Sequence, residues 1–231
     1  MTPPETPADA RGFLFALEMH DARLQLVARH HPGYGAVCVD WLVADVARRI
    51  AGGRRQLLAR AVGLHQRADA RVLDATAGLG RDGFTLAALG ARVTLAERNP
   101  TIAVLLADGR RRALADRAMA DAARRTEVVA CDARDLLESD WDAVLLDPMY
   151  PAQGKSALSK KELQALRELA GDDADAADVL AAALAGRAAR VAVKRPLKAP
   201  PLGGHAPAFQ LKGTQARFDI YRPARAESRP A

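Results

Sequence analysis

The stretch Asp74-Ala-Thr-Ala-Gly-Leu-Gly-Arg-Asp82 decides the fold of this 231-residue chain. The apolar run 71–74 before it is typical of a buried strand, and the amphipathic stretch after it has the period of a helix. The quoted residues therefore predict a turn from strand to helix, in which Gly78 and Gly80 let the backbone approach a ligand closely. Gly78, Gly80 and Gly83 have the spacing G-x-G-x-x-G, which by itself is only a weak signal for a pyrophosphate site.

After residue 70, strand-like and helix-like segments alternate, which predicts a parallel sheet with crossover helices. Apolar runs predict strands over 71–75, 91–96, 127–131, 143–147 and 190–194. Helical patterns cover 82–89, 100–118, 133–137, 160–170 and 176–188. The last runs, 208–211 and 217–221, predict a hairpin rather than another helical crossover. We therefore expect the α/β class, with a seven-stranded, mostly parallel sheet closed by an antiparallel hairpin, as in Rossmann-like (class I) methyltransferases.

The N-terminal part of the chain has a different pattern. Three short apolar segments, 13–19, 23–29 and 36–41, predict a small antiparallel meander. Two short helices are expected after it, over 42–50 and 54–62, joined by a glycine break. The predicted organisation is a disordered N-terminus (1–11), an α+β appendage (12–66), a methyltransferase domain (67–222) and a disordered tail (223–231).

Composition narrows the possible classes of protein. Hydrophobic residues make up 49% of the chain, which is normal for a globular protein whose core is stable without disulfides or a structural metal. Cys38 and Cys131 lie in apolar runs without a C-x-x-C pair, so we expect reduced thiols in a soluble, cytoplasmic protein. The sequence has no membrane-length apolar run, no metal-ligand spacing of histidines, no nucleophile elbow and no P-loop. These observations leave little support for membrane proteins, metalloenzymes, hydrolases or kinases.

Charged residues follow the first two predicted strands. Arg81 and Asp82 stand at the end of the glycine turn, and Glu97 and Arg98 end the second strand. Ligands of doubly wound folds bind at the carboxyl ends of the strands, where Glu97 could accept both hydroxyl hydrogens of a ribose and Arg98 could contact the adenosine. S-adenosylmethionine carries no phosphate but has a sulfonium and an amino acid, so it suits an acidic pocket. Asp82 and Glu97 are also suited to ordinary helix starts.

The third strand is followed by Asp132-Ala133. A side-chain acceptor there could bind the exocyclic amine of adenine, and the next backbone N–H could meet a ring nitrogen. Asp132 could equally be a simple N-cap for the helical segment 133–137.

The fourth strand ends in Asp147-Pro-Met-Tyr150. The lone pair of an aromatic amine is delocalised into its ring, so such a nucleophile needs orientation. The carboxylate of Asp147 and the carbonyl of Pro148 could hold its hydrogens, and Tyr150 could stack on the base. A carboxylate would also stabilise the cationic amine that forms. A D-P turn is common by itself, but this run at a strand end favours a catalytic role for Asp147 and Tyr150.

Basic residues suggest a polyanionic partner. The formal net charge is +6, which is compatible with a nucleic-acid partner but also follows from an arginine-rich composition. The clusters beside the expected site are more informative, and we expect them to contact RNA phosphates: Lys155, Lys160, Lys161, Lys194 and Arg195.

The chain resembles the bacterial small-subunit (16S) ribosomal RNA guanine-N2 methyltransferase family in a set of motifs: VLDATAGLGRDGF (72–84), ERNP (97–100), LDPMYP (146–151), KSAL (155–158) with KK (160–161), VKRP (193–196) and RFDIY (217–221). The resemblance implies transfer of a methyl group from S-adenosylmethionine to a guanine amine in 16S rRNA, either free or in an assembly intermediate of the small ribosomal subunit. It places the cofactor on Arg81-Asp82, Glu97-Arg98, Asp132-Ala133 and Asp147. Asp132-Ala133 departs from the family's usual two serines, and Met149 departs from the proline of D-P-P-Y enzymes.

Other functions remain open at this point. A catalytically silent RNA-binding module would explain the arginine clusters, but it gains nothing from Asp82, Glu97 and Asp147. A nucleotide-dependent oxidoreductase would continue with a sixth β-α unit, whereas the last runs of this chain predict a hairpin. Methylation of another nucleic-acid base amine, or of a protein glutamine, is chemically closer, although those sites usually carry Asn where this chain has Asp147.

Overall fold

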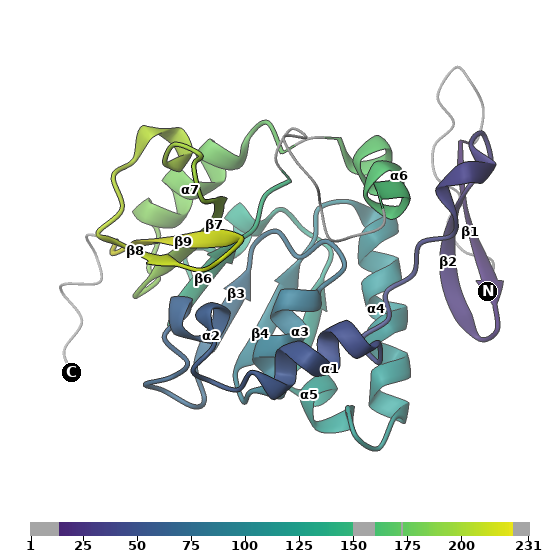
Figure 1. Ribbon diagram of the computed structural model, residues 1–231, viewed down its shortest axis with the longest axis horizontal. Helices are drawn as coiled ribbons and strands as arrows, with labels where there is room; N and C mark the ends of the chain where they lie inside the picture. The colour runs from purple at the N-terminus through teal and green to yellow at the C-terminus, as the bar shows by residue number, and fades with distance from the viewer. Residues whose placement is uncertain (1–13, 150–159, 172, 224–231) are drawn as a thin grey trace.

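A seven-stranded sheet forms the centre of the molecule in the computed structural model, which describes residues 14–149, 160–171 and 173–223 (Figure 1). The strands are β3 (Arg71–Asp74), β4 (Arg92–Ala96), β5 (Thr126–Val129), β6 (Ala143–Leu146), β7 (Val191–Pro196), β8 (Phe209–Lys212) and β9 (Ala216–Tyr221). Their order across the sheet is β5-β4-β3-β6-β7-β9-β8. The pairs from β5 to β7 are parallel, whereas β9 pairs antiparallel with β7 and β8. The expected α/β fold with a terminal hairpin is confirmed.

The connections between the strands are mostly helical: α3 (Arg81–Ala88), α4 (Pro100–Ala115), α5 (Ala120–Arg124), α6 (Lys160–Ala170) and α7 (Ala176–Ala185), with short 3-10 segments η2 (Ala133–Leu136) and η3 (Leu202–Gly204). The start of α4 follows from its cap, because the Asn99 side chain accepts hydrogen bonds from the N–H groups of Thr101 and Ile102. The helix expected over 100–118 ends at Ala115. The side chain of Asp116 accepts from the N–H groups of Ala118 and Met119 in a turn, and the separate helix α5 begins after this turn at Ala120.

The N-terminal part contains β1 (Phe15–His20), β2 (Arg23–Ala28), the 3-10 turn η1 (Pro32–Tyr34), α1 (Ala44–Ala51) and α2 (Leu57–Ala61). The prediction of a third strand over 36–41 is wrong, since only an isolated bridge joins Leu26 to Val37. Val37, Val39 and Trp41 are instead buried in the core. The Trp41 ring stacks on Phe84 of α3 with centroids 4.3 Å apart. Alternating apolar residues here pack the segment onto the sheet domain, with which it shares one core.

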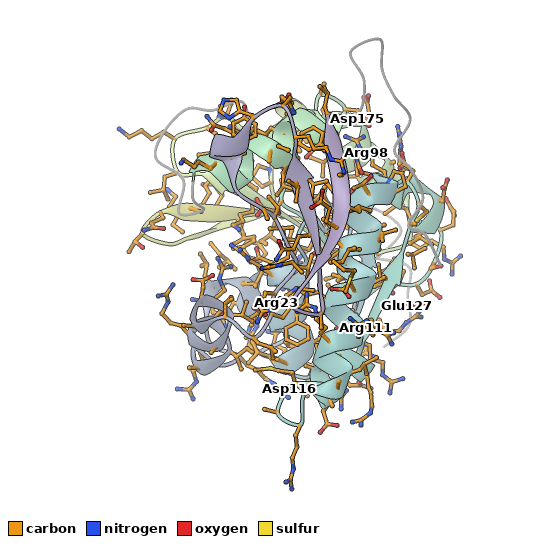
Figure 2. All side chains as sticks on the ribbon, turned by 90° about the vertical axis from the view of Figure 1, so that its right-hand side faces the viewer. Arg23, Arg98, Arg111, Asp116, Glu127 and Asp175 are labelled. Atoms are coloured by element: carbon orange, nitrogen blue, oxygen red, sulfur yellow. The ribbon has the colours of Figure 1, made fainter. Side chains whose placement is uncertain are left out.

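The β1–β2 hairpin lies along α4, as Figure 2 shows with Arg23 and Arg111 labelled. Asp108 of α4 accepts a hydrogen bond from the Leu24 backbone N–H at 3.1 Å, and Arg111 donates to the Ala22 carbonyl at 3.3 Å. The hairpin is thus fixed to the helix through its backbone.

Both faces of the sheet are buried, as expected for parallel strands covered by helices. Alternate residues of β6 belong to opposite faces: Ala143 and Leu145 join the core under α3 and α4, while Val144 and Leu146 join the core under α7. Figure 1 shows α1 and α3 in front of the sheet. In the described part of the chain, no helix is long and apolar enough to cross a membrane.

Gly83 sets how closely α3 approaches the sheet. A Cβ at this position would lie 2.3 Å from Cδ2 of Leu95 and 2.9 Å from Oδ2 of Asp74, and both side chains are buried. We expect Gly83→Ala to destabilise the protein by about 1–3 kcal/mol, although alanine is the better helix former. Urea unfolding followed by circular dichroism would measure this. A variant as stable as the parent would show that α3 can shift without cost.

Candidate active site

The carboxyl ends of the parallel strands open onto a cavity of about 930 Å³. The strand order reverses here, because β4 lies on one side of β3 and β6 on the other, and open α/β sheets bind ligands at such a point. The cavity brings together these sequence-predicted residues: Gly78, Arg81, Asp82, Glu97, Arg98, Asp132, Ala133, Asp147 and Lys194.

Glu97 fastens the end of β4 to the glycine turn. Its Oε2 accepts from the Gly78 N–H at 3.0 Å, and its Oε1 accepts from the Asn99 N–H at 2.8 Å. The residue is 9% exposed, and burial raises its pKa although the two N–H groups oppose this shift. Gly78 adopts φ +52°, a left-handed conformation that glycine allows without strain. The carboxylate therefore has a fixed orientation at the cavity wall.

A chain of ion pairs crosses the cavity from α3 to β6. Lys194 on β7 donates from Nζ to Oδ2 of Asp82 at 2.9 Å and to Oδ2 of Asp147 at 2.7 Å. Arg49 of α1 donates to Oδ1 of Asp82 at 2.5 Å, and Asp45 binds the Nε of Arg49 at 2.9 Å. We call these five residues, Asp45, Arg49, Asp82, Lys194 and Asp147, the ion-pair chain.

Within the ion-pair chain, the pKa values of Asp82 and Asp147 are shifted in opposite directions. Burial alone would raise the pKa of Asp82, but Lys194 and Arg49 outweigh it and hold that pKa below its usual value. The pKa of Asp147 is raised, because burial and the nearby Asp82 charge outweigh the attraction of Lys194. Burial disfavours the charged form of Lys194, yet the two carboxylates raise its pKa, so the ammonium persists.

Asp74 is a site residue that sequence reasoning missed. It ends β3, is 2% exposed, and has its pKa raised to about 8 by burial and by the Asp82 charge. The neighbouring Thr76 accepts through Oγ1 from the Asp147 N–H at 2.7 Å and so ties the end of β6 to the glycine turn. The sequence does contain a signal for Asp74, because this acidic residue ends a predicted strand, as Glu97 and Asp147 do.

Arg98 lines the cavity and forms ion pairs with two aspartates that also line it. Its guanidinium binds both carboxylate oxygens of Asp175 at 2.7 Å and Oδ1 of Asp173 at 2.8 Å. Figure 2 shows Arg98 and Asp175 together above the start of α4. Oδ2 of Asp173 accepts from the Met149 N–H at 2.7 Å. Through Asp173, Arg98 connects the end of β4 to the loop after β6. Its guanidinium is bound by carboxylates in this structure.

Asp132 and Ala133 adopt the capping arrangement that the sequence left open. Oδ1 of Asp132 accepts from the Arg134 N–H at 2.9 Å, and its carboxylate also pairs with the Arg134 side chain. The helix expected over 133–137 is only the 3-10 turn η2. Ala133 is buried at the cavity wall.

The five residues expected at RNA phosphates lie in different surroundings. Lys194 is bound inside the cavity. Arg195 is 6% exposed and donates to the Pro200 carbonyl at 2.6 Å from Nη2, so its geometry argues against a phosphate contact. Lys161 is exposed in the first turn of α6. Lys155, like Tyr150, lies outside the described residues, as does the side chain of Lys160.

Within the described residues, no group of three or more His, Cys, Asp or Glu side chains is arranged to hold a metal ion.

Comparison with known proteins agrees with this geometry. Residues 8–223 match the protein family described as "Putative SAM-dependent methyltransferase". The chain is 46% identical over 214 residues to a protein of Ectopseudomonas mendocina named ribosomal RNA small subunit methyltransferase J, covering 90% of this chain and 82% of that protein. A protein of the same name from Thioalkalivibrio sulfidiphilus is 47% identical over 212 residues, covering 89% and 82%.

A solved structure is also similar. The crystal structure of a SAM-dependent methyltransferase from Neisseria gonorrhoeae superposes with a TM-score of 0.69 at 35% identity, covering 88% of this chain and 80% of that one. The family match, the relatives and the fold lead to one conclusion: the chain belongs to the S-adenosylmethionine-dependent methyltransferases.

Proposed function

We propose that the protein methylates the exocyclic N2 amine of a guanine in 16S rRNA. Relatives that are named small-subunit ribosomal RNA methyltransferases share nearly half of their residues with this chain over most of its length. The observation that carries the chemistry is Asp147, whose carboxylate is anchored at one oxygen by Lys194 and keeps 37% of its side chain open to the cavity.

The residues at the strand ends fit the cofactor. We assign the ribose hydroxyls to Glu97, whose carboxylate is already oriented by two backbone N–H groups. Asp132 and the backbone of Ala133 would meet the adenine, and Gly78 gives the cofactor room beside the turn. Arg81 and Asp82 would face the amino-acid end. When bound, S-adenosylmethionine supplies a methyl group on a sulfonium that leaves as a neutral thioether.

The residues after β6 would orient the guanine. Asp147 and the Pro148 carbonyl accept the two N2 hydrogens, which directs the nitrogen lone pair toward the methyl group. As the nitrogen becomes cationic, the Asp147 charge stabilises it and the carboxylate then takes the proton and passes it to water. Tyr150 is assigned to stacking on the base. The guanine must leave its own stack to enter the cavity, so a base-paired guanine should react poorly.

The basic residues between positions 155 and 161 supply the contact with RNA in this proposal. Lys161, with Lys155 and Lys160, would bind phosphates, and the net charge of +6 favours association with a polyanion. The partner is 16S rRNA, free or in an assembly intermediate of the small ribosomal subunit, which places the reaction in the cytoplasm.

The proposal is tested with purified protein, cofactor labelled in its methyl group, and separately purified small-subunit rRNA, large-subunit rRNA and tRNA. We expect label in small-subunit rRNA alone. Label in another RNA would assign a different substrate, and a protein that binds RNA without binding the cofactor in calorimetry would be a non-catalytic module.

A further inference from the structure

Lys194 is placed where the two halves of the proposed reaction meet. Its β7 strand lies beside β6, so its Nζ reaches Asp147 at the guanine side and Asp82 at the cofactor side. The Lys194 side chain is 28% exposed and the Asp82 side chain is 13% exposed. An ammonium in such surroundings is held by its two carboxylates rather than by water.

We propose that Lys194 is a positioning residue that holds Oδ2 of Asp147, and that it thereby presents Oδ1 to the guanine amine. This inference rests on the proposed function, because it assigns the step that Asp147 performs. Within the described residues, the hydrogen bond seen on the Asp147 carboxylate goes to Oδ2. Carboxylates turn readily about their last bond, and an anchor at one oxygen fixes the direction of the other.

The rest of the ion-pair chain keeps Lys194 in place. Asp82 accepts from Lys194 with Oδ2 and from Arg49 with Oδ1. Arg49 is in turn bound by Asp45 within α1. Lys194 is thus tied to α1 through α3, and α1 and α3 are remote in sequence from β6. A lysine fixed in this way cannot follow a phosphate without breaking its ion pairs with Asp147 and Asp82, of which, among the described residues, Asp82 alone keeps a second partner, Arg49.

The charges around Asp147 also favour this role for Lys194. The groups facing Asp147 are Lys194 from β7, Asp82 from α3, Asp74 from β3 and Arg49 from α1. Burial and the Asp82 charge favour a protonated Asp147, and Lys194 opposes them. Because the proposed reaction needs the carboxylate, loss of Lys194 should make Asp147 bind its proton more tightly. The acidic limb of the rate profile would then move to higher pH.

The first test compares single-turnover methylation rates from pH 5 to pH 9 in Lys194→Met, Lys194→Arg and Lys198→Met. Lys198 is an exposed lysine four residues away, outside the cavity, and serves as the control for net charge. We expect the acidic limb to move up by about one to three pH units in Lys194→Met. Lys194→Arg should keep the parental limb, because it keeps the charge, and Lys198→Met should also keep it.

The second test uses no substrate or cofactor. The melting temperature of Lys194→Met should fall on the order of 10 °C below that of the parent at pH 8, where ionised Asp147 loses its ammonium partner and Asp82 keeps only Arg49 of its described partners. The difference should be less than half as large at pH 4, because Asp147, whose pKa is raised and rises further without Lys194, binds a proton there and then needs no counter-charge. If Lys194→Met does not fold, Lys194→Met combined with Asp82→Asn removes one buried negative charge and serves instead.

The outcomes separate this inference from the proposed function. A parent enzyme that methylates no rRNA guanine contradicts the function, whatever the melting temperatures show. An active parent whose Lys194→Met variant keeps the parental pH limb, or whose stability difference is the same at both pH values, overturns the positioning role. If Lys194→Met instead lowers the log–log salt slope of RNA binding by about one, and Lys198→Met does not, Lys194 is a phosphate contact.

Discussion

Asp147→Ala is expected to slow methyl transfer about a hundred- to a thousandfold, while cofactor affinity falls only modestly. A guanine amine is a weak nucleophile, so the rate must come from orientation and from stabilising the positive charge. The Asp147 carboxylate interacts more strongly as the amine becomes cationic, which is stabilisation specific to the transition state. Lys194 would retain Asp82 as a partner in this variant, so the cavity should keep its shape.

Single-turnover kinetics with saturating RNA and cofactor would measure the effect. Asp147→Asn keeps an acceptor oxygen without the charge, so its rate should fall between those of the parent and Asp147→Ala. Asp121→Ala removes a carboxylate that is 93% exposed on α5 and provides the control. The catalytic assignment is falsified if correctly folded Asp147→Ala reacts at the parental rate.

Glu97→Ala is expected to weaken cofactor binding by about 1.5–3 kcal/mol, which is roughly 10- to 150-fold, because charge-assisted hydrogen bonds to the ribose are lost. Glu97→Gln should weaken cofactor binding almost as much as Glu97→Ala does. Both carboxylate oxygens accept from backbone N–H groups, and a glutamine would turn an NH₂ group toward one of these donors.

Titration calorimetry on variants that melt cooperatively would give the affinities. Glu127→Ala is the matched control, since Glu127 is an exposed glutamate on the adjacent strand β5, labelled in Figure 2, and does not line the cavity. Equal affinities for the parent and Glu97→Ala would remove Glu97 from the ribose site.

Most of the sheet could be predicted from the sequence, because buried parallel strands are short apolar runs bounded by turn residues. The expected strand 143–147 is observed as β6 over Ala143–Leu146. The segment 36–41 shows the limit of this reasoning. Its alternating Val37, Val39 and Trp41 suit a half-buried strand, but Val39 lies against Gly109 of α4 and Trp41 against Phe84 of α3. No local pattern distinguishes the two kinds of packing.

The candidate site was predictable where a residue's position along a strand decides its neighbours. Asp82, Glu97 and Asp147 follow parallel strands, so they meet at one edge of the sheet. Lys194 and Arg195 were treated as one cluster, although adjacent strand residues point in opposite directions. Only Lys194 of the two lines the cavity. Arg49 lies 33 residues from Asp82 on a separate helix, and this contact follows from tertiary packing alone.

The division at residue 66 stays a prediction, and so does the stacking role of Tyr150. The N-terminal segment nevertheless contributes directly to the site, through Arg49, and to the core, through Trp41. Loss of the segment would therefore remove a counter-charge of Asp82 as well as packing for α3.

The central claim is that the protein places a methyl group on N2 of a guanine in 16S rRNA. Nucleoside mass spectrometry of 16S rRNA from parent cells, from cells lacking the gene, and from such cells expressing either the parent protein or Asp147→Ala tests it most directly. We predict that one N2-methylguanosine disappears with the gene, returns with the parent protein, and does not return with Asp147→Ala. An identical set of modified guanosines in parent and deletion cells would contradict the claim.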